Sequence, residues 1–240
     1  MIKARKIVPL ALITLLLLSM RPAVAAPPTP DEKEKVLRRL DEAAKIFHST
    51  SADFQFDTYL TDPIPDQETQ KGTVYYERTG KNFRMAAHIR VDNKKPVEKV
   101  YTFSGGVFRL FEGGNLNQVT TFSQAGKFES YLMLGFGASG KELEEKWEIK
   151  YLGSETLLDG NTKIKTEKLE LVAKDPAVHK TIPKVTIWVD PVSGVNLKQI
   201  FDEGSSQTRV AVYFNIKVNQ PLPAGVFTLK TNSKTTNVNR

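Results

Sequence analysis

The most constraining feature of the sequence is a run of alternating apolar and polar residues near its C-terminal end. The run occupies 209–218, and its apolar members are Val210, Val212, Phe214, Ile216 and Val218. Successive side chains of a strand point to opposite faces, so this period of two predicts a strand with one apolar face and one polar face. Antiparallel sheets built from such strands bury one face and expose the other. We therefore expect either the wall of a packed core or the wall of a container.

Similar alternation extends over most of the chain. Between 52 and 122 it predicts about six strands, several of them joined by glycine turns such as those at 105–106 and 113–114. From 148 onward it predicts about five more strands, which end with the run at 209–218. Strands joined as successive hairpins form an antiparallel meander, and such a sheet closes or curls to hide its apolar face.

Two segments have helical spacing instead. The first is expected to run from about Asp31 to His48, and its apolar stripe consists of Val36, Leu40, Ala43, Ala44 and Phe47. The second, from about Lys127 to Trp147, fits two short helices joined by a glycine-rich loop. This insertion interrupts the strands halfway, where it can cover the open mouth of a curled sheet. The residues expected to face the sheet from these two segments are Leu40, Phe47, Tyr131, Leu132, Leu134 and Phe136.

The first residues predict export. Lys3, Arg5 and Lys6 precede an apolar run over 7–18, and the small residues Ala23 and Ala25 stand where a signal peptidase cleaves. The apolar run is shorter than the roughly 20 residues that span a bilayer. The sequence contains no cysteine, so it has neither a lipidation site nor disulfides. We expect a signal peptide at 1–25 and a single, monomeric domain at 26–240, located in the periplasm of a two-membrane bacterium.

The charge balance argues against a nucleic-acid partner. The whole chain carries a formal net charge of +7, and four of its basic residues lie in the expected signal peptide, which contains no acidic residue. The mature chain would therefore carry about +3, too little to predict a basic binding surface for nucleic acid.

No catalytic constellation stands out. Gly135, Gly137 and Gly140 match the spacing of a nucleotide-binding loop, but Glu142 occupies the position at which a P-loop needs a hydroxyl, and no strand and helix alternation surrounds it. The three histidines, at 48, 88 and 179, show neither metal-ligand nor triad spacing. We therefore expect no enzymatic activity, no metal and no organic cofactor, and we interpret the glycines as a flexible hinge.

Several short motifs, taken in order, resemble the LolA family of periplasmic lipoprotein carriers. They include LDEAAKIFHSTSADFQ at 40–55, where a helix leads into a strand, and GKNFR at 80–84, which is similar to the family's strand motif ending in "FR". The other motifs are GTVY at 72–75, DPVSG at 190–194, LKQIF at 197–201 and NQPLPAGVF at 219–227. Together they extend over nearly all of the mature chain.

This resemblance implies a mainly β fold of the α+β type: an unclosed antiparallel half-barrel of about eleven strands with a helical lid. It implies a carrier that shelters the acyl chains of lipoproteins between the inner and outer membranes. The implied partners are acylated lipoproteins, an inner-membrane ABC-type release complex, and an outer-membrane acceptor or the membrane itself. A carrier of another lipid or hydrophobic metabolite, and a lipid-sensing regulatory module, remain alternatives.

The expected acyl-chain cavity combines the apolar faces of three strands. Its residues are Phe54, Phe56, Phe83, Met85, Ile89, Val210, Val212, Phe214 and Ile216. Arg84 matches the arginine of the "FR" motif, which the resemblance assigns to hydrogen bonds with the lid in the closed state. The neighbouring Met85 departs from the aromatic residue that is usual there.

Overall fold

The computed structural model describes residues 30–80, 82–90, 99–123, 132–204 and 207–240. Within these residues, one twelve-stranded sheet has the order β12-β6-β5-β4-β3-β2-β1-β11-β10-β9-β8-β7. The first six strands are β1 Ser49–Leu60, β2 Asp66–Thr79, β3 Asn82–Arg90, β4 Lys99–Ser104, β5 Val107–Glu112 and β6 Gln118–Phe122. The other six are β7 Trp147–Asp159, β8 Thr162–Ala173, β9 Lys184–Asp190, β10 Val195–Asp202, β11 Gln207–Val218 and β12 Thr236–Asn239.

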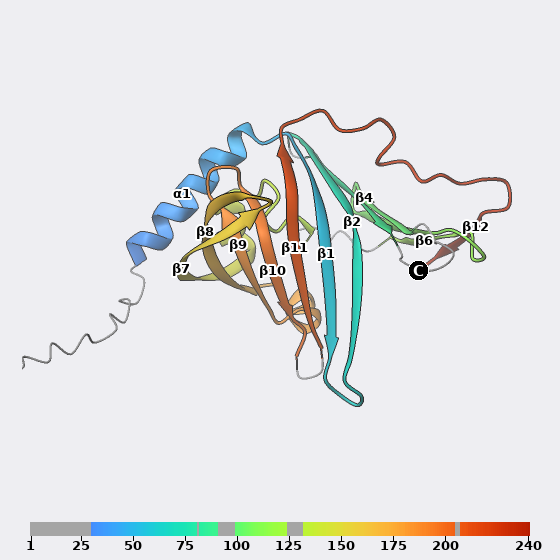
Figure 1. Cartoon of the computed structure of the whole chain (residues 1–240), viewed down its shortest axis with the longest axis horizontal. Helices are drawn as coiled ribbons and strands as arrows, with labels where there is room; N and C mark the ends of the chain where they lie inside the picture. Colours follow the sequence, from blue (N-terminus) through green and yellow to red (C-terminus); the bar gives the residue numbers. More distant parts are fainter. Residues whose placement is uncertain (1–29, 81, 91–98, 124–131, 205–206) are drawn as a thin grey trace, which may run out of the picture.

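The sheet is an open, curled meander rather than a closed barrel. Its two edge strands, β7 and β12, lie at opposite ends of the strand order, and every pairing except that between β12 and β6 is antiparallel. Strands β1 and β11 pair at the centre, with β2–β6 on one side and β7–β10 on the other (Figure 1). The expected half-barrel with an N-terminal helix and a mid-chain helical insertion is therefore confirmed.

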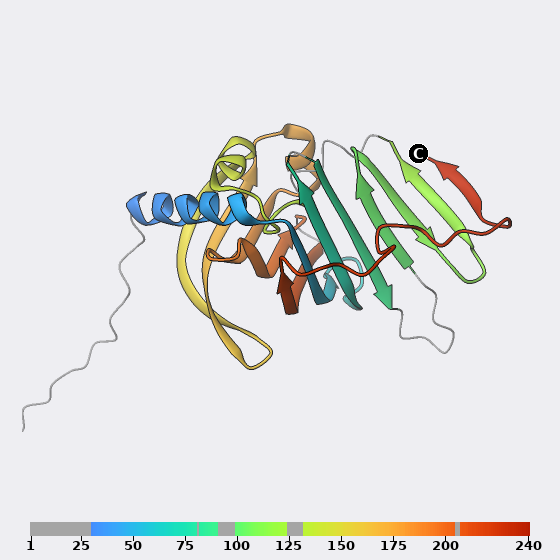
Figure 2. The ribbon, with the colours of Figure 1, turned by 90° about the horizontal axis from the view of Figure 1, so that it is seen from above.

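Helix α1 (Pro30–Ile46) lies across the half of the sheet formed by β7–β9 (Figure 2). Its buried residues are Val36, Leu37, Leu40 and Ala43, and Phe47 is buried just after the helix ends. They form the stripe predicted from helical spacing, except that Leu37 joins it and Ala44 is only half-buried. The helix packs on α3 (Gly140–Lys146) and on β7, so the two helical segments cover the concave face together.

Two elements escaped the sequence prediction. Helix α4 (Pro176–Thr181) begins where Asp175 accepts hydrogen bonds from the backbone N–H groups of Ala177 and Val178, with proline in the first turn. The Asp-Pro pair is a recognisable helix start, so a signal was present.

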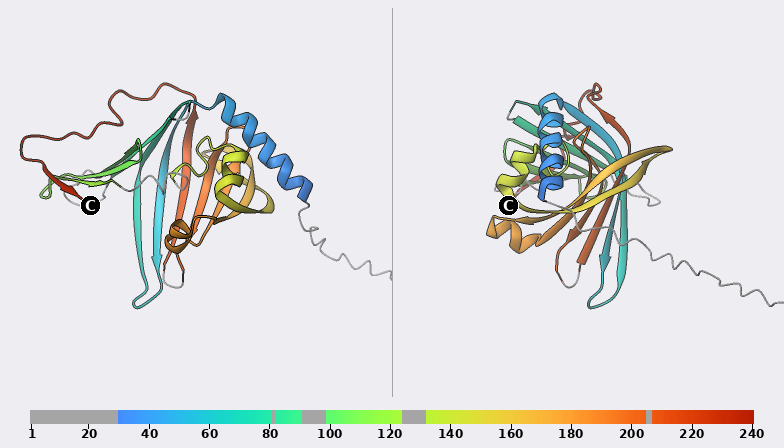
Figure 3. Two further views of the ribbon diagram at one scale, coloured as in Figure 1. Left: turned by 180° about the vertical axis from the view of Figure 1, so that it is seen from behind. Right: turned by 90° about the vertical axis from the view of Figure 1, so that its left-hand side faces the viewer.

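The second missed element is the twelfth strand. It completes a C-terminal strap, residues 219–240, which runs along the convex side of β3–β6 and ends beside β6 (Figure 3). Under the strap lies a small second core of Val100, Phe111 and Val119, against which Leu229 packs. The His88 ring also lies 2.8 Å from the carbonyl oxygen of Val226.

The expected signal peptide lies outside the described residues. Among the residues that are described, no helix is both long and apolar enough to span a bilayer.

Candidate functional site

A cavity of about 530 Å³ lies on the concave face of the sheet. Its apolar wall comes from β1, β2, β3, β4, β5, β10 and β11 and from the loop before α3. The apolar and aromatic lining residues are Phe54, Phe56, Leu60, Val74, Tyr76, Met85, Ala87, Ile89, Tyr101, Phe108, Leu132, Phe201 and Tyr213. A volume of this size lies within the range of roughly 300–1,000 Å³ that is typical of small-molecule sites.

Aromatic rings form much of the cavity wall. Phe56 and Phe201 have ring centroids 6.2 Å apart, and Tyr101 and Phe108 have centroids 5.7 Å apart. Burial raises the pKa of Tyr101, so its hydroxyl remains neutral at physiological pH. The wall is therefore uncharged along most of its length.

Polar side chains gather where the cavity meets solvent. Glu68, Gln70, Gln207 and Arg209 line this part of the cavity. They lie at the end of β1 where Leu60 pairs with Gln207, and Leu60 is 37% exposed. The cavity thus has an apolar interior and one polar, solvent-exposed rim.

The other end is closed by the plug, residues 132–139, which precedes α3. Phe136 stacks on Tyr76, with ring centroids 3.8 Å apart, and lies edge-on to Tyr213 at 5.0 Å. The carbonyl oxygen of Leu134 accepts a hydrogen bond of 2.7 Å from Gln199 Nε2. Leu134 and Phe136 are both 1% exposed, so the plug is part of the core.

The glycines of the plug, which we expected to form a flexible hinge, fit tightly against neighbouring side chains. Gly135 has a φ of +72°, and a Cβ there would lie 1.8 Å from the Asn196 side chain. Gly137 has a φ of +79°, and a Cβ there would lie 2.2 Å from the Phe47 ring. Backbone hydrogen bonds also tie the plug to the start of β10, including one of 2.7 Å from Asn196 N–H to the Gly135 carbonyl. Glycine is needed here for close packing and for positive φ.

Arg78, on β2, fastens the plug and α3 to the sheet. Its Nη1 donates to the Gly137 carbonyl at 2.7 Å and to Glu142 Oε2 at 3.1 Å, while Nη2 pairs with the other oxygen of Glu142. Ser139 caps α3, and its backbone N–H donates to Glu142 as well. Burial would raise the pKa of Glu142, but the hydrogen bonds from Arg78 and Ser139 outweigh it, and the pKa lies below its usual value.

Arg84, the expected latch, lies elsewhere. Its Nε donates to Glu77 at 2.6 Å, its guanidinium lies 4.2 Å from the centroid of the Phe227 ring, and its side chain is 46% exposed. Glu77 and Arg84 are register partners on the convex face, where the C-terminal strap runs. The structure therefore places Arg78, and not Arg84, against the plug. The sequence held a signal for this, because a tight turn after Thr79 pairs Arg78 with the inward-facing Phe83.

The orientation of β11 also differs from the expectation. Tyr213 pairs with Phe54, and both line the cavity, whereas Val212 pairs with Gln55 on the opposite face. Ala211 is fully buried, and Val212 is 38% exposed. Val210, Val212 and Phe214 therefore point to the convex side of the sheet. A bulge at Asn215, with φ of +54°, then shifts the alternation, and Ile216 packs against the main core.

The remaining predicted site residues separate into four groups. Phe54, Phe56, Met85 and Ile89 line the cavity, as does Leu132 from the plug. Phe83 is buried behind the wall, between the rings of Tyr76 and Phe103. Leu40 on α1 and Phe47 just after it are buried, and Tyr131 lies outside the described residues.

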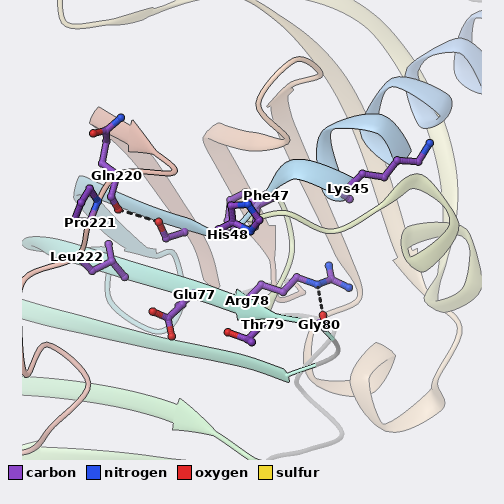
Figure 4. Close-up of a pocket in the computed structure, with 12 residues that line it drawn as sticks. Lys45, Phe47, His48, Glu77, Arg78, Thr79, Gly80, Gln220, Pro221 and Leu222 are labelled. Atoms are coloured by element: carbon purple, nitrogen blue, oxygen red, sulfur yellow. Dashed lines mark hydrogen bonds between the residues drawn. The ribbon is translucent and has the colours of Figure 1, made fainter.

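A second hollow of about 600 Å³ lies near the C-terminal end of α1 (Figure 4). Lys45, His48, Arg78 and Glu77 line it together with the start of the strap at 220–222. Its lining is largely polar, in contrast to the concave cavity. Across the described part of the chain, no group of three or more histidine and carboxylate side chains could hold a metal ion.

No family model matches the chain, and no curated protein matches it. Among solved structures, it is similar to a DUF1329 family protein from Desulfovibrio piger, with 12% identity, a TM-score of 0.46 and coverage of 82% of this chain and 96% of that chain. A putative outer membrane lipoprotein-sorting protein domain from Vibrio parahaemolyticus shows 13% identity, a TM-score of 0.42 and coverage of 82% and 97%. A LolA superfamily protein from Nitrosomonas europaea shows 15% identity, a TM-score of 0.39 and coverage of 85% and 99%.

Proposed function

We propose that this protein is a periplasmic carrier that shelters the acyl chains of lipoproteins and moves them from the inner towards the outer membrane. The observation that carries the proposal is the concave cavity, which has an uncharged aromatic wall, a closed end and a polar rim. The motifs that resemble the LolA family and the leader expected at 1–25 support the cargo and the compartment.

The physical basis is the cost of moving hydrocarbon through water. Each methylene that leaves water gains roughly 0.8 kcal/mol, so an acyl chain needs an apolar container to leave a membrane. The cavity offers aromatic and aliphatic contacts to such a chain, and its polar rim can remain in contact with water and with the head of the cargo. In this proposal an inner-membrane ABC-type complex releases the cargo, and an outer-membrane acceptor or the membrane itself receives it.

A carrier of free lipid is the second candidate. The observation that favours it is the polar rim, where Gln70, Gln207 and Arg209 could contact the headgroup of a free lipid as readily as the acylated end of a protein. Mass spectrometry of the molecules that co-purify with the exported protein separates these two cargos, because one contains a polypeptide and the other does not.

Cavity filling tests the site itself. Ala87 lines the cavity and Val212 lies on the convex face, so Ala87→Trp and Val212→Trp add the same side chain to opposite sides of the sheet. We expect delipidated wild type and Val212→Trp to bind a fluorescent fatty acid, and Ala87→Trp to bind it at least about tenfold more weakly, since lost apolar burial of about 1.4 kcal/mol changes an equilibrium tenfold. Equal binding by all three proteins would place the acyl site elsewhere.

A further inference from the structure

Three exposed apolar side chains occur within six residues at the tip of the β1–β2 hairpin. We define the hairpin tip as residues 59–66. Ile64 is 74% exposed, Tyr59 is 38% exposed and Leu60 is 37% exposed. The tip is the lowest point of the ribbon in Figure 1, beyond the ends of β10 and β11. A single exposed isoleucine is common on protein surfaces, and what distinguishes Ile64 is where it lies relative to the cavity.

The hairpin tip adjoins the open end of the cavity. Phe54, Phe56 and Leu60 share the concave face of β1, and all three line the cavity. An apolar track therefore leads along one strand from the buried interior to Leu60, four residues before Ile64. At the other end of the same strand, the plug closes the route.

We propose that the hairpin tip inserts shallowly into the surface of a lipid bilayer and holds the open end of the cavity against it during loading or delivery. This proposal rests on the proposed function, because it gives the acyl chain a short path between membrane and cavity. Ile64 and Leu60 would enter the interface, and Tyr59 would lie at headgroup level, where tyrosine is enriched.

The small size of the apolar surface favours a membrane over a protein partner. Specific protein interfaces bury about 1,200–2,000 Å² in total and depend on clustered aromatic and arginine anchors. Three side chains at the hairpin tip fall far short of that area. A reversible membrane contact needs only a few partitioning side chains, and a carrier must leave the membrane again.

Charge on the hairpin specifies the kind of bilayer. Asp62 and Asp66 flank Ile64, and Glu68 follows on β2, so acidic groups surround the apolar tip. Anionic headgroups would repel them, and the contact should be stronger on zwitterionic lipid.

A single-site fluorophore tests the contact directly, because the chain has no cysteine. Ile64→Cys labelled with nitrobenzoxadiazole should brighten and shift to shorter wavelength when phosphatidylcholine vesicles are added. The matched control is Val192→Cys, which is 70% exposed in native form but lies between β9 and β10, at the opposite end of the strands. The response of Ile64→Cys should be weaker with phosphatidylglycerol vesicles. No response at Ile64→Cys, or equal responses at both positions, would overturn the proposal.

A second measurement separates this inference from the proposed function. Ile64 does not line the cavity, so Ile64→Asp should bind a fluorescent fatty acid in solution as tightly as wild type. Its uptake of the same probe from phosphatidylcholine vesicles should be about tenfold slower, since burial of one isoleucine changes an equilibrium by at least that factor. Unchanged uptake would overturn the membrane contact alone. Failure of the wild type to bind the probe in solution would overturn the proposed function instead.

Discussion

At the scale of single residues, Arg78 makes the main polar contacts that stabilise the closed end of the half-barrel. Arg78 satisfies the Gly137 carbonyl and both carboxylate oxygens of Glu142, so it ties the plug and α3 to β2 at the same time. Charge-assisted, bidentate contacts of this kind are stronger and more directional than neutral hydrogen bonds. The closed state therefore depends on a few polar atoms as well as on the apolar packing of Phe136.

Replacing Arg78 should loosen the plug without unfolding the sheet. We expect Arg78→Leu to weaken local closure by about 1–2 kcal/mol, because it leaves a carbonyl and a carboxylate without their donor. Amide hydrogen exchange should then be roughly 5- to 30-fold faster in 132–146, with little change in β9 and β10. Arg84→Leu is the matched control, since Arg84 contacts Glu77 and Phe227 on the convex face. Similar plug exchange in both variants would contradict the role of Arg78.

The stability that the ion pair between Arg78 and Glu142 contributes should fall as the pH is lowered. The pKa of Glu142 is lowered in the folded protein, so its ionised form contributes stability above the usual value of 4.5, and this contribution is lost as pH falls towards the folded pKa. Glu142→Gln removes that titration. We expect wild type to exceed Glu142→Gln in urea midpoint at pH 7 and the difference to shrink at pH 3.5. A difference that stays constant over this range would show that the ionised carboxylate does not stabilise the fold.

At the scale of secondary-structure elements, the sequence predicts the strands and helices well, but it does not predict which face of β11 turns inward. The alternation in 209–218 separates Val210, Val212 and Phe214 from their neighbours, yet only pairing with β1 places Tyr213 beside Phe54 in the cavity. The β7–β8 hairpin also reaches β11, where Asp159 accepts hydrogen bonds from the backbone N–H groups of Asn215 and Ile216.

The same limit applies to the latch and the strap. The "FR" motif draws attention to Arg84, but strand register and the position of the plug decide which arginine meets it. The residues of the strap do not alternate regularly, so the sequence does not predict its strand, and the place of Leu229 against Val100 and Phe111 follows from tertiary contact alone. Local pattern thus determines element type, whereas long-range pairing determines which side chains meet.

The plug glycines give a prediction at this scale. We expect Gly135→Ala to lower the free energy of unfolding by about 2–5 kcal/mol, combining roughly 1–2 kcal/mol for left-handed backbone with roughly 1–3 kcal/mol for overpacking against Asn196. Gly105→Ala is the matched control, because Gly105 also has a positive φ, of +58°, but a Cβ there would meet nothing within 4 Å. Urea unfolding of both variants measures the difference. Equal losses of unfolding free energy in the two variants would mean that the plug rearranges easily around the added methyl group, as a flexible hinge would.

At the scale of the whole molecule, the two ends of the curled sheet are different. One end is closed by α1, the plug and Arg78, and the other is open between the hairpin tip and the start of β11. The strap covers the outer face of β3–β6, where Leu229 packs on the small second core, and it pairs with the edge of β6. This arrangement suits a container that exchanges its contents through one opening.

Site-specific photo-crosslinking in cells is the most direct test of the central claim that acylated proteins occupy the concave cavity. A photoreactive amino acid would replace Phe56, which lines the cavity, or Phe214, which lies on the convex face of the neighbouring strand. We predict that position 56 captures acylated lipoproteins and that position 214 does not. Capture at neither position, or capture at position 214 alone, would contradict it.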